Sequence, residues 1–346
     1  MPSTRQTLEI LFRTIDSPIM LIGVHGSGKS EMVAQCAETL GLLFIDVRLS
    51  QFTEGDLLGV PYKSDKNTTR FFPPDRFQLA TETPCLLFLD ELNRATREVR
   101  QAVFQLADSG RIGSLQIHKH TKIVSAINPD NGAYEVNSLD PAELDRWFLF
   151  KFQPSVDEWL QWGAEQKNGQ RNVISNEILD YIRANQDDLD PVIVESQDQQ
   201  NGPSRRSWKR LDAALAKART LYPSFCGNVY LVKQMFNGFL GEEIGKKFFS
   251  YFIQYQKRQI LQNVLDKTLP IEYAKKEDSV SLIKDIETNG LRISAQYESF
   301  GDNIMYFAKF VSSLPKEMQE PIKRSVKKHC TTKFNSVFSV IMAANK

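Results

Sequence analysis

Residues 23–30 read Gly-Val-His-Gly-Ser-Gly-Lys-Ser, which is a complete G-x-x-x-x-G-K-[ST] pattern. In this pattern the glycines let backbone N–H groups turn toward phosphate oxygens. The lysine adds a positive charge, and the final hydroxyl can ligate Mg²⁺. The spacing therefore predicts a loop that binds the phosphates of a nucleotide. Its candidate binding residues are Gly23, His25, Gly26, Ser27, Gly28, Lys29 and Ser30.

A second group with chemical potential is the acidic pair Asp90 and Glu91, which follows the apolar run 86–89. Carboxylates at the carboxyl end of a buried strand lie at the edge of an open α/β sheet where ligands bind. Phosphoryl transfer needs mainly positioning and charge stabilisation. Asp90 is thus a candidate Mg²⁺ ligand, and Glu91 a candidate base for the attacking water. Acids at a helix N-terminus are the alternative, but the upstream phosphate loop favours the catalytic interpretation.

The third candidate is Asn128, which follows the apolar run 123–127 and precedes a proline. Its amide is suited to hydrogen-bond a terminal phosphate or the attacking water. Asn-Pro is equally typical of a turn. The residues alone leave both interpretations open.

These groups need a scaffold, and the apolar pattern predicts one. Strands are expected at 18–22, 42–47, 85–89, 123–127 and 147–152, with helices at 31–40 and 97–107. Strands that alternate with helices, some of them apolar on both faces, predict an α/β fold with a parallel sheet. From residue 153 the apolar spacing is helical. We expect an α/β core over 1–152, a helical segment over 153–221, and a further helical region of unknown role over 222–346.

The composition excludes several classes of protein. The formal net charge of the 346 residues is +1, so no global field attracts nucleic acid or a membrane. The four cysteines form no C-x-x-C pair, and no run of 18 apolar residues occurs. We therefore expect a reduced, cytoplasmic protein without a membrane segment. His118 and His120 are expected on one face of a strand, where an exposed hairpin face is favoured over a metal site.

Five segments together resemble the AAA+ ATPases, and most closely the MoxR and dynein-related branch with its CbbQ/NorQ-type activators. The resemblance extends over about residues 5–220 and is carried by segments 23–30, 89–95, 126–129, 139–146 and 204–208. It implies a P-loop AAA+ core with a five-stranded parallel sheet, followed by an α-helical lid.

The resemblance also implies roles for single residues. Lys29 and Ser30 match the Walker A pair, and Asp90 and Glu91 match the Walker B pair. Asn128 matches sensor 1.

Four arginines are implied as well. Arg146 occupies the position of an arginine finger that reaches the neighbouring subunit. Apart from the resemblance, the acidic neighbour Asp145 and the aromatic strand that follows are expected to hold Arg146 rigid. Arg206 matches the sensor-2 arginine, although Arg205 stands where relatives often have proline and is the alternative. Arg94 is similar to a family arginine that acts across the interface, and its part in the site stays open.

The resemblance further implies ATP and Mg²⁺ as cofactors and a homo-oligomer of six subunits. Segment 110–122 would be a hairpin before sensor 1, and 54–59 with 71–74 an insert facing the ring pore. The leading function is a MoxR-like chaperone that remodels or activates a partner protein, such as one with a von Willebrand factor A-type domain.

Two other functions stay open. One is a nucleic-acid motor or a restriction- or defence-type NTPase on the same core. The six lysines and arginines after Glu320, with no acid among them, keep it open, although a solvated helix face is the favoured explanation. The other is a nucleotide-binding scaffold with slow hydrolysis, which the intact Glu91 and Arg146 disfavour.

Overall fold

The computed structural model describes residues 2–64, 68–72, 74–113, 115–129, 138–167, 171–190, 202–222, 228–256, 260–267, 269, 271 and 276–344. Contacts divide the chain into two compact units. The first comprises Met1–Trp162, Asp190–Asp198 and Ser204–Arg206. The second comprises Gly163–Leu189, Gln199–Pro203 and Ser207–Lys346.

The first unit is built on a five-stranded sheet whose strand order is β2-β5-β8-β1-β9. Every neighbouring pair runs parallel, which confirms the predicted parallel sheet. The five strands are β1 (Ile19–Ile22), β2 (Leu43–Arg48), β5 (Cys85–Asp90), β8 (Lys122–Ile127) and β9 (Phe148–Lys151). Each lies within a residue or two of the expected range.

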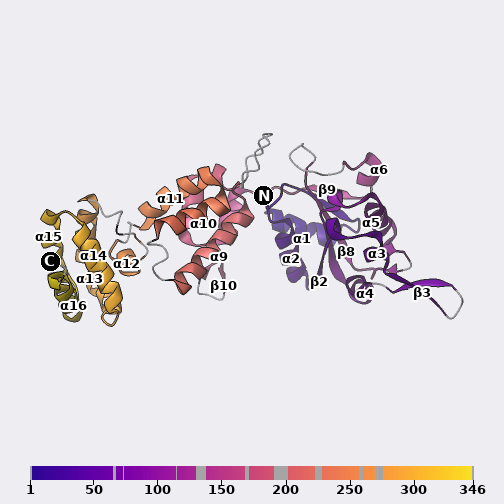
Figure 1. The fold of residues 1–346 in the computed structure, drawn as a ribbon. Helices are drawn as coiled ribbons and strands as arrows, with labels where there is room; N and C mark the ends of the chain where they lie inside the picture. Colours follow the sequence, from indigo (N-terminus) through magenta and orange to yellow (C-terminus); the bar gives the residue numbers. More distant parts are fainter. Residues whose placement is uncertain are drawn as a thin grey trace. The chain divides into compact units, whose positions relative to one another are not determined.

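Helices cover both faces of this sheet, which explains the unbroken apolar run of β5. Leu86 and Phe88 pack in one core cluster with residues of α1 and α2. Leu87 and Leu89 pack in a second cluster with residues of α4 and α5. Figure 1 shows α1 and α2 on one side of the sheet and α5 on the other. Successive side chains of a strand point to opposite faces, so a strand buried on both sides has no polar alternation.

The remaining elements of the first unit connect and cover the strands. They are α1 (Thr4–Thr14), α2 (Lys29–Leu40), η1 (Leu49–Gln51), α3 (Glu54–Leu58), β3 (Val60–Lys63), β4 (Thr69–Phe72), α4 (Asp75–Glu82), η2 (Leu92–Arg94), α5 (Arg97–Ser109), β6 (Arg111–Ile112), β7 (Leu115–Gln116), α6 (Pro141–Leu144) and α7 (Val156–Ala164), which continues into the second unit.

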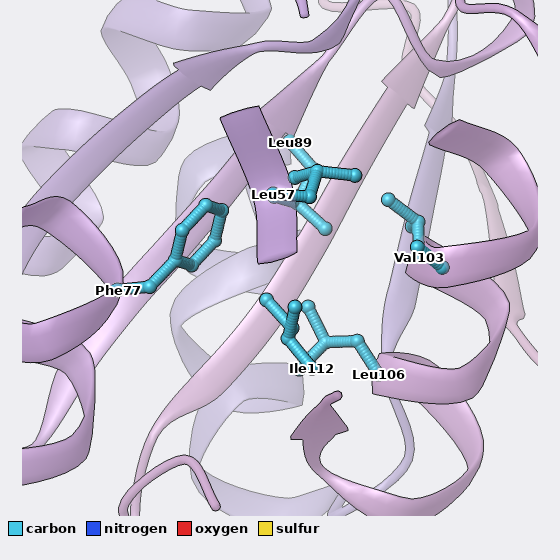
Figure 2. A pocket seen from close by; sticks show the side chains of 7 residues that line it. Leu57, Phe77, Leu89, Val103, Leu106 and Ile112 are labelled. Atoms are coloured by element: carbon cyan, nitrogen blue, oxygen red, sulfur yellow. The ribbon is translucent and has the colours of Figure 1, made fainter. Parts of the chain in front are cut away.

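Apolar side chains support the end of β5 that carries the acidic pair. Leu57 of α3, Phe77 of α4 and Val103 of α5 surround Leu89, and Figure 2 shows how they converge. The gap between them has no room for a water molecule. Close packing of this kind fixes the strand end, because a shift of Leu89 would forfeit contacts with three helices at once.

The second unit is almost entirely helical, as expected for the region after residue 153. Its elements are β10 (Gln166–Lys167), β11 (Arg171–Asn172), α8 (Asn176–Ala184), η3 (Gln186–Asp188), α9 (Arg205–Leu221), α10 (Val229–Leu240), α11 (Glu242–Gln256), α12 (Ile260–Leu265), α13 (Lys276–Gln296), α14 (Gly301–Ser313), α15 (Lys316–His329) and α16 (Thr332–Ala344). The first two residues of α9 belong to the first unit.

An aromatic cluster forms part of the core of the second unit. The ring of Trp208 lies 5.6 Å from that of Tyr181 and 5.2 Å from that of Phe248, measured between centroids. The Trp208 indole N–H donates to the carbonyl oxygen of Asp188 at 3.0 Å. The one polar atom of this buried ring is therefore satisfied.

One local prediction is wrong. His118 and His120 do not share a strand face, because residues 117–121 form a turn between β7 and β8. The N–H of Thr121 donates to the His118 carbonyl at 2.8 Å, and the N–H of His120 donates to His118 Nδ1 at 3.3 Å. These bonds close the turn and end the strand pairing after Gln116.

Some predictions fall on residues that the structure does not describe. Pro73 of the expected insert and Cys226, one of the four cysteines, lie outside the described residues. Within the described ranges, no helix combines the length and apolarity that crossing a bilayer requires.

Candidate nucleotide site

The phosphate loop connects the end of β1 to the start of α2. The helix begins at Lys29 rather than at the expected Glu31, so the loop leads directly into its first turn. Gly28 caps the helix with φ of 95°, a left-handed conformation that a residue with a Cβ rarely adopts. The N–H groups in the first turn of a helix have no partner within the helix, which makes this helix N-terminus suited to an anion.

A cavity of about 340 Å³ opens over the loop and the carboxyl ends of β5 and β8. It brings together most of the residues that the sequence singled out. Its lining residues are His25, Gly26, Ser27, Gly28, Lys29, Ser30, Asp90, Glu91, Arg94, Ala126, Ile127, Asn128 and Arg206. Gly23 is not among them, although its carbonyl oxygen accepts a hydrogen bond from Lys29.

Lys29 is the most tightly held cation of the cavity, with only 9% of the residue exposed. Its Nζ donates to the carbonyl oxygens of Gly23 at 2.7 Å and Val24 at 2.9 Å, and to Asn128 Oδ1 at 3.2 Å. Burial lowers the pKa of Lys29 to about 8, and the nearby Arg206 acts in the same direction. A bound phosphate would favour the charged form of this ammonium group.

Ser30 and Asp90 lie side by side, with Oγ and Oδ2 3.4 Å apart. Burial raises the pKa of Asp90, while Lys29 opposes that shift. A hydroxyl and a partly buried carboxylate are the hard oxygen donors that Mg²⁺ prefers. A cation beside Asp90 would also stabilise its charged form. The two residues therefore fit a magnesium site shared with a bound phosphate. Among the described residues, no group of three His, Cys, Asp or Glu side chains could bind a metal by itself.

Glu91 follows directly, in a left-handed backbone conformation with φ of 58°. Its carboxylate accepts a hydrogen bond from the Ser50 hydroxyl and lies 3.8 Å from Nη1 of Arg94. The sequence analysis missed Ser50. This residue follows β2, and only the strand order places β2 next to β5.

Asn128 is held by Asn93, a residue that no sequence motif singled out. Nδ2 of Asn93, a residue only 2% exposed, donates to the Asn128 carbonyl oxygen at 2.8 Å. The turn after the acidic pair is thus tied to the end of β8. The one available signal was the position of Asn93 two residues after Glu91, which does not identify its partner.

The structure separates the two arginines, of which the resemblance favoured Arg206 and kept Arg205 as the alternative. Arg206 lines the cavity. Arg205 is 8% exposed and forms an ion pair with Asp190, with Nη2 and Oδ2 2.9 Å apart. His25 lies at the same cavity, and burial lowers its pKa with help from the charges of Arg206, Lys29 and Arg94.

Arg146 does not line the cavity formed by these described residues. Its Nε donates to Asp108 Oδ2 at 2.8 Å, and its guanidinium lies 5.8 Å from the centroid of the Phe104 ring. The expectation that Asp145 holds this arginine is therefore wrong. Asp108 comes from α5, and the packing of α5 beside the turn at 145–146 brings it within reach.

A family model built from known proteins also matches the part of the chain that forms this site. Residues 18–147 match the family model described as AAA domain (dynein-related subfamily), so this stretch of the chain is an AAA domain of that subfamily. The matched stretch includes the phosphate loop, the acidic pair, Asn128 and Arg146. No curated protein matches the chain.

Two solved structures are similar to the chain at low sequence identity. NtrX from Brucella abortus is 15% identical over 70% of this chain, with a TM-score of 0.33, and the chain spans 62% of that NtrX chain. A point mutant of RuvB from Thermotoga maritima is 14% identical over 86% of this chain and 80% of its own, with a TM-score of 0.38.

The parallel sheet, the phosphate loop after β1 and the acidic pair at the end of β5 together define the class of protein. The first unit has the P-loop α/β fold of an AAA+ protein, and its AAA domain binds nucleotide. An AAA domain that keeps both motifs intact is an ATPase domain.

Proposed function

We propose that this protein is a ring-forming ATPase that remodels or activates a partner protein. Each copy binds ATP in the cavity over its phosphate loop. ATP hydrolysis takes place at the interface between two copies, and the free energy that it releases drives a structural change in the bound partner protein. This is the function of the MoxR and dynein-related branch that the sequence resembles.

Six side chains of the cavity have a physical role in this proposal. Lys29 and the N–H groups at the start of α2 hold the β- and γ-phosphates. Glu91 orients the attacking water and accepts its proton, which requires its carboxylate to turn from Ser50 toward the cavity. The Asn128 amide and the Arg206 guanidinium contact the terminal phosphate. Mg²⁺, held by Ser30 and Asp90, would neutralise charge that develops on the phosphate oxygens.

The observation that carries the proposal is the position of Arg146. It is held by Asp108 and Phe104, with its side chain one-third exposed at 33%, and it does not line the cavity of its own unit. A rigid, accessible guanidinium outside its own nucleotide site is suited to complete the site of a neighbouring copy. An arginine supplied in trans raises phosphoryl-transfer rates by roughly 10³ to 10⁵.

A site completed in trans implies a head-to-tail interface between copies, and such an interface closes into a ring. Six subunits follow from the family resemblance. We propose residues 153–221 as the lid and the cytoplasm as the location. The proposed partner is a protein with a von Willebrand factor A-type domain.

The alternative function is a nucleic-acid motor on the same core. One observation favours it, namely the second half of α15. Arg324, Lys327 and Lys328 are exposed there, and no acid follows Glu320 in the chain. Hydrolysis that double-stranded DNA stimulates, in a manner that weakens with salt, would support the motor over the protein remodeller.

Subunit mixing tests the proposal. Arg146→Ala and Lys29→Ala should each be nearly inactive alone, the first for lack of the finger and the second for lack of nucleotide. In a 1:1 mixture the rings assemble at random. About a quarter of their sites then combine an intact phosphate loop with an intact arginine from the neighbouring subunit. Activity should recover to that level. Arg13→Ala, on the exposed side of α1, is the control and should stay fully active.

Two results would contradict the proposal. If the mixture recovers nothing at any ratio, Arg146 does not act in trans. If the protein stays a monomer with ATP present and hydrolyses ATP at full rate, hydrolysis does not depend on an interface between copies. The partner is tested by pull-down of the products of adjacent genes with the Glu91→Gln variant in ATP. Retention that requires ATP is the expected result.

A further inference from the structure

Arg205 is a buried guanidinium whose contacts join three separate stretches of the first unit. Its Nε and Nη2 donate to Asp190 Oδ1 at 3.0 Å and Oδ2 at 2.9 Å. Nη2 also donates to the Pro154 carbonyl oxygen at 2.6 Å, and Nη1 to the Ser155 carbonyl oxygen at 3.4 Å. The first residue of α9 is thereby tied to residue 190 and to the segment before α7.

The residues on either side of Arg205 pack against the phosphate loop. The N–H of Arg206 donates to the Gly26 carbonyl oxygen at 3.3 Å. A Cβ placed on Gly26 would lie 3.0 Å from both Cβ and Oγ of Ser204. The start of α9 is thus held from two sides, by the Arg205 ion pair and by the loop itself.

Arg206 gains from such support, because other basic residues of the cavity repel its charge. Its charge lowers the pKa of both His25 and Lys29, and Arg94 lines the same cavity, so four basic residues share it with Asp90 and Glu91. Arg206 is exposed, and its long side chain forms no ion pair with the described residues that line the cavity. A flexible arginine that is repelled by its neighbours would turn toward solvent if its backbone were free to move.

We propose that the Arg205–Asp190 ion pair is a positioning device for Arg206. It fixes the first turn of α9, so that the next side chain points into the cavity and meets the terminal phosphate. The planar fork of arginine matches a carboxylate with two parallel bonds and so sets an orientation, which a lysine cannot do. This inference rests on the proposed role of Arg206 in binding ATP.

A double-mutant cycle tests the device, with the ratio of the Kd for ADP to the Kd for ATP as the readout. Only ATP carries the terminal phosphate, so a contact made by Arg206 shows in this ratio. Arg206→Ala should lower the preference for ATP by roughly tenfold, as expected for the loss of a charge-assisted hydrogen bond. Arg205→Lys and Asp190→Asn should each lower it by roughly fivefold in the parent chain.

In the Arg206→Ala background, Arg205→Lys should change the ratio by less than about twofold, because the residue that it positions is gone. Lysine keeps the charge and most of the volume, so the variant is expected to fold, and its melting temperature is measured in parallel. Arg210→Lys, an exposed position one turn further along α9, is the control and should leave the ratio unchanged.

The outcomes separate this inference from the proposed function. If Arg205→Lys lowers the ratio as much without Arg206 as with it, the ion pair does not act through Arg206 and the inference is overturned while the ATP site stands. If Arg206→Ala leaves the ratio unchanged, the proposed role of Arg206 fails, and the inference with it. If Arg205→Lys weakens the binding of ATP and of ADP equally, the Arg205–Asp190 ion pair stabilises the nucleotide site as a whole, and the positioning role is refuted.

Discussion

Substitution of Gly26 by alanine tests the packing of the α9 start against the phosphate loop. Gly26 has φ of +69°, in the left-handed region, where an alanine is disfavoured by about 1–2 kcal/mol. The added methyl would also lie 3.0 Å from Cβ and Oγ of Ser204, closer than ordinary van der Waals contact. Overpacking of this kind typically costs about 1–3 kcal/mol. We expect Gly26→Ala to lower the free energy of unfolding of the first unit by about 2–5 kcal/mol.

The two contributions can be separated, because only the contact depends on Ser204. Ser204→Gly removes both atoms that the new methyl would meet, and its own cost at a helix start is a few tenths of a kcal/mol. The double variant should recover the contact part, about 1–3 kcal/mol, and keep the backbone part. Urea unfolding followed by tryptophan fluorescence is a suitable assay, since three of the four tryptophans lie in the first unit.

A matched control is available in α3. Gly55 has no positive φ, and a Cβ there would meet only Thr53 Oγ1 at 3.8 Å, an ordinary contact. Gly55→Ala should therefore be neutral or slightly stabilising. If Gly26→Ala is as stable as this control, or if Ser204→Gly restores nothing, then Ser204 does not pack on the loop and the reasoning is refuted.

Three further outcomes are expected. Glu91→Gln should bind ATP with unchanged affinity and hydrolyse it about 10² to 10⁴ times more slowly, as measured by phosphate release, and normal turnover would exclude Glu91 as the base. Burial lowers the pKa of His25, and bound triphosphate should raise it by adding negative charge. Binding then takes up a proton, so calorimetry should find the affinity for Mg-ATP highest at acidic pH and falling as pH rises through the pKa of the complex. His25→Asn should flatten that profile, and a persistent slope would contradict the assignment. In a Cys226→Ser variant the native protein should resist thiol reagents until it unfolds, and rapid labelling of the folded chain would refute this. The reason is that burial raises the pKa of each remaining thiol, namely Cys36, Cys85 and Cys330.

The amino-acid sequence determined the chemistry that depends on neighbours along the chain. A phosphate loop works through its own backbone and the helix that follows it, so its residues are recognisable from spacing alone. The same holds for Asp90 and Glu91, which need only a buried strand to carry them. The parallel sheet was predictable for a related reason, since strands buried on both faces must be apolar throughout.

Only the tertiary structure decided which side chains hold these groups in place. Ser50 reaches Glu91, and Asn93 reaches Asn128, because β2, β5 and β8 are neighbours in the sheet. Chain order does not fix that arrangement. The pairing of Arg146 with Asp108 instead of Asp145 depends on the packing of α5 in the same way.

The choice between Arg205 and Arg206 shows most clearly what a sequence pattern cannot predict. The two side chains are identical and adjacent, and only the family resemblance favoured Arg206 over Arg205. Successive residues of a helix point about 100° apart. Once the first turn of α9 is placed, one guanidinium must face Asp190 and the other the cavity. That placement comes from contacts with residues 26, 154 and 190, which are distant in the chain and are brought together only by folding.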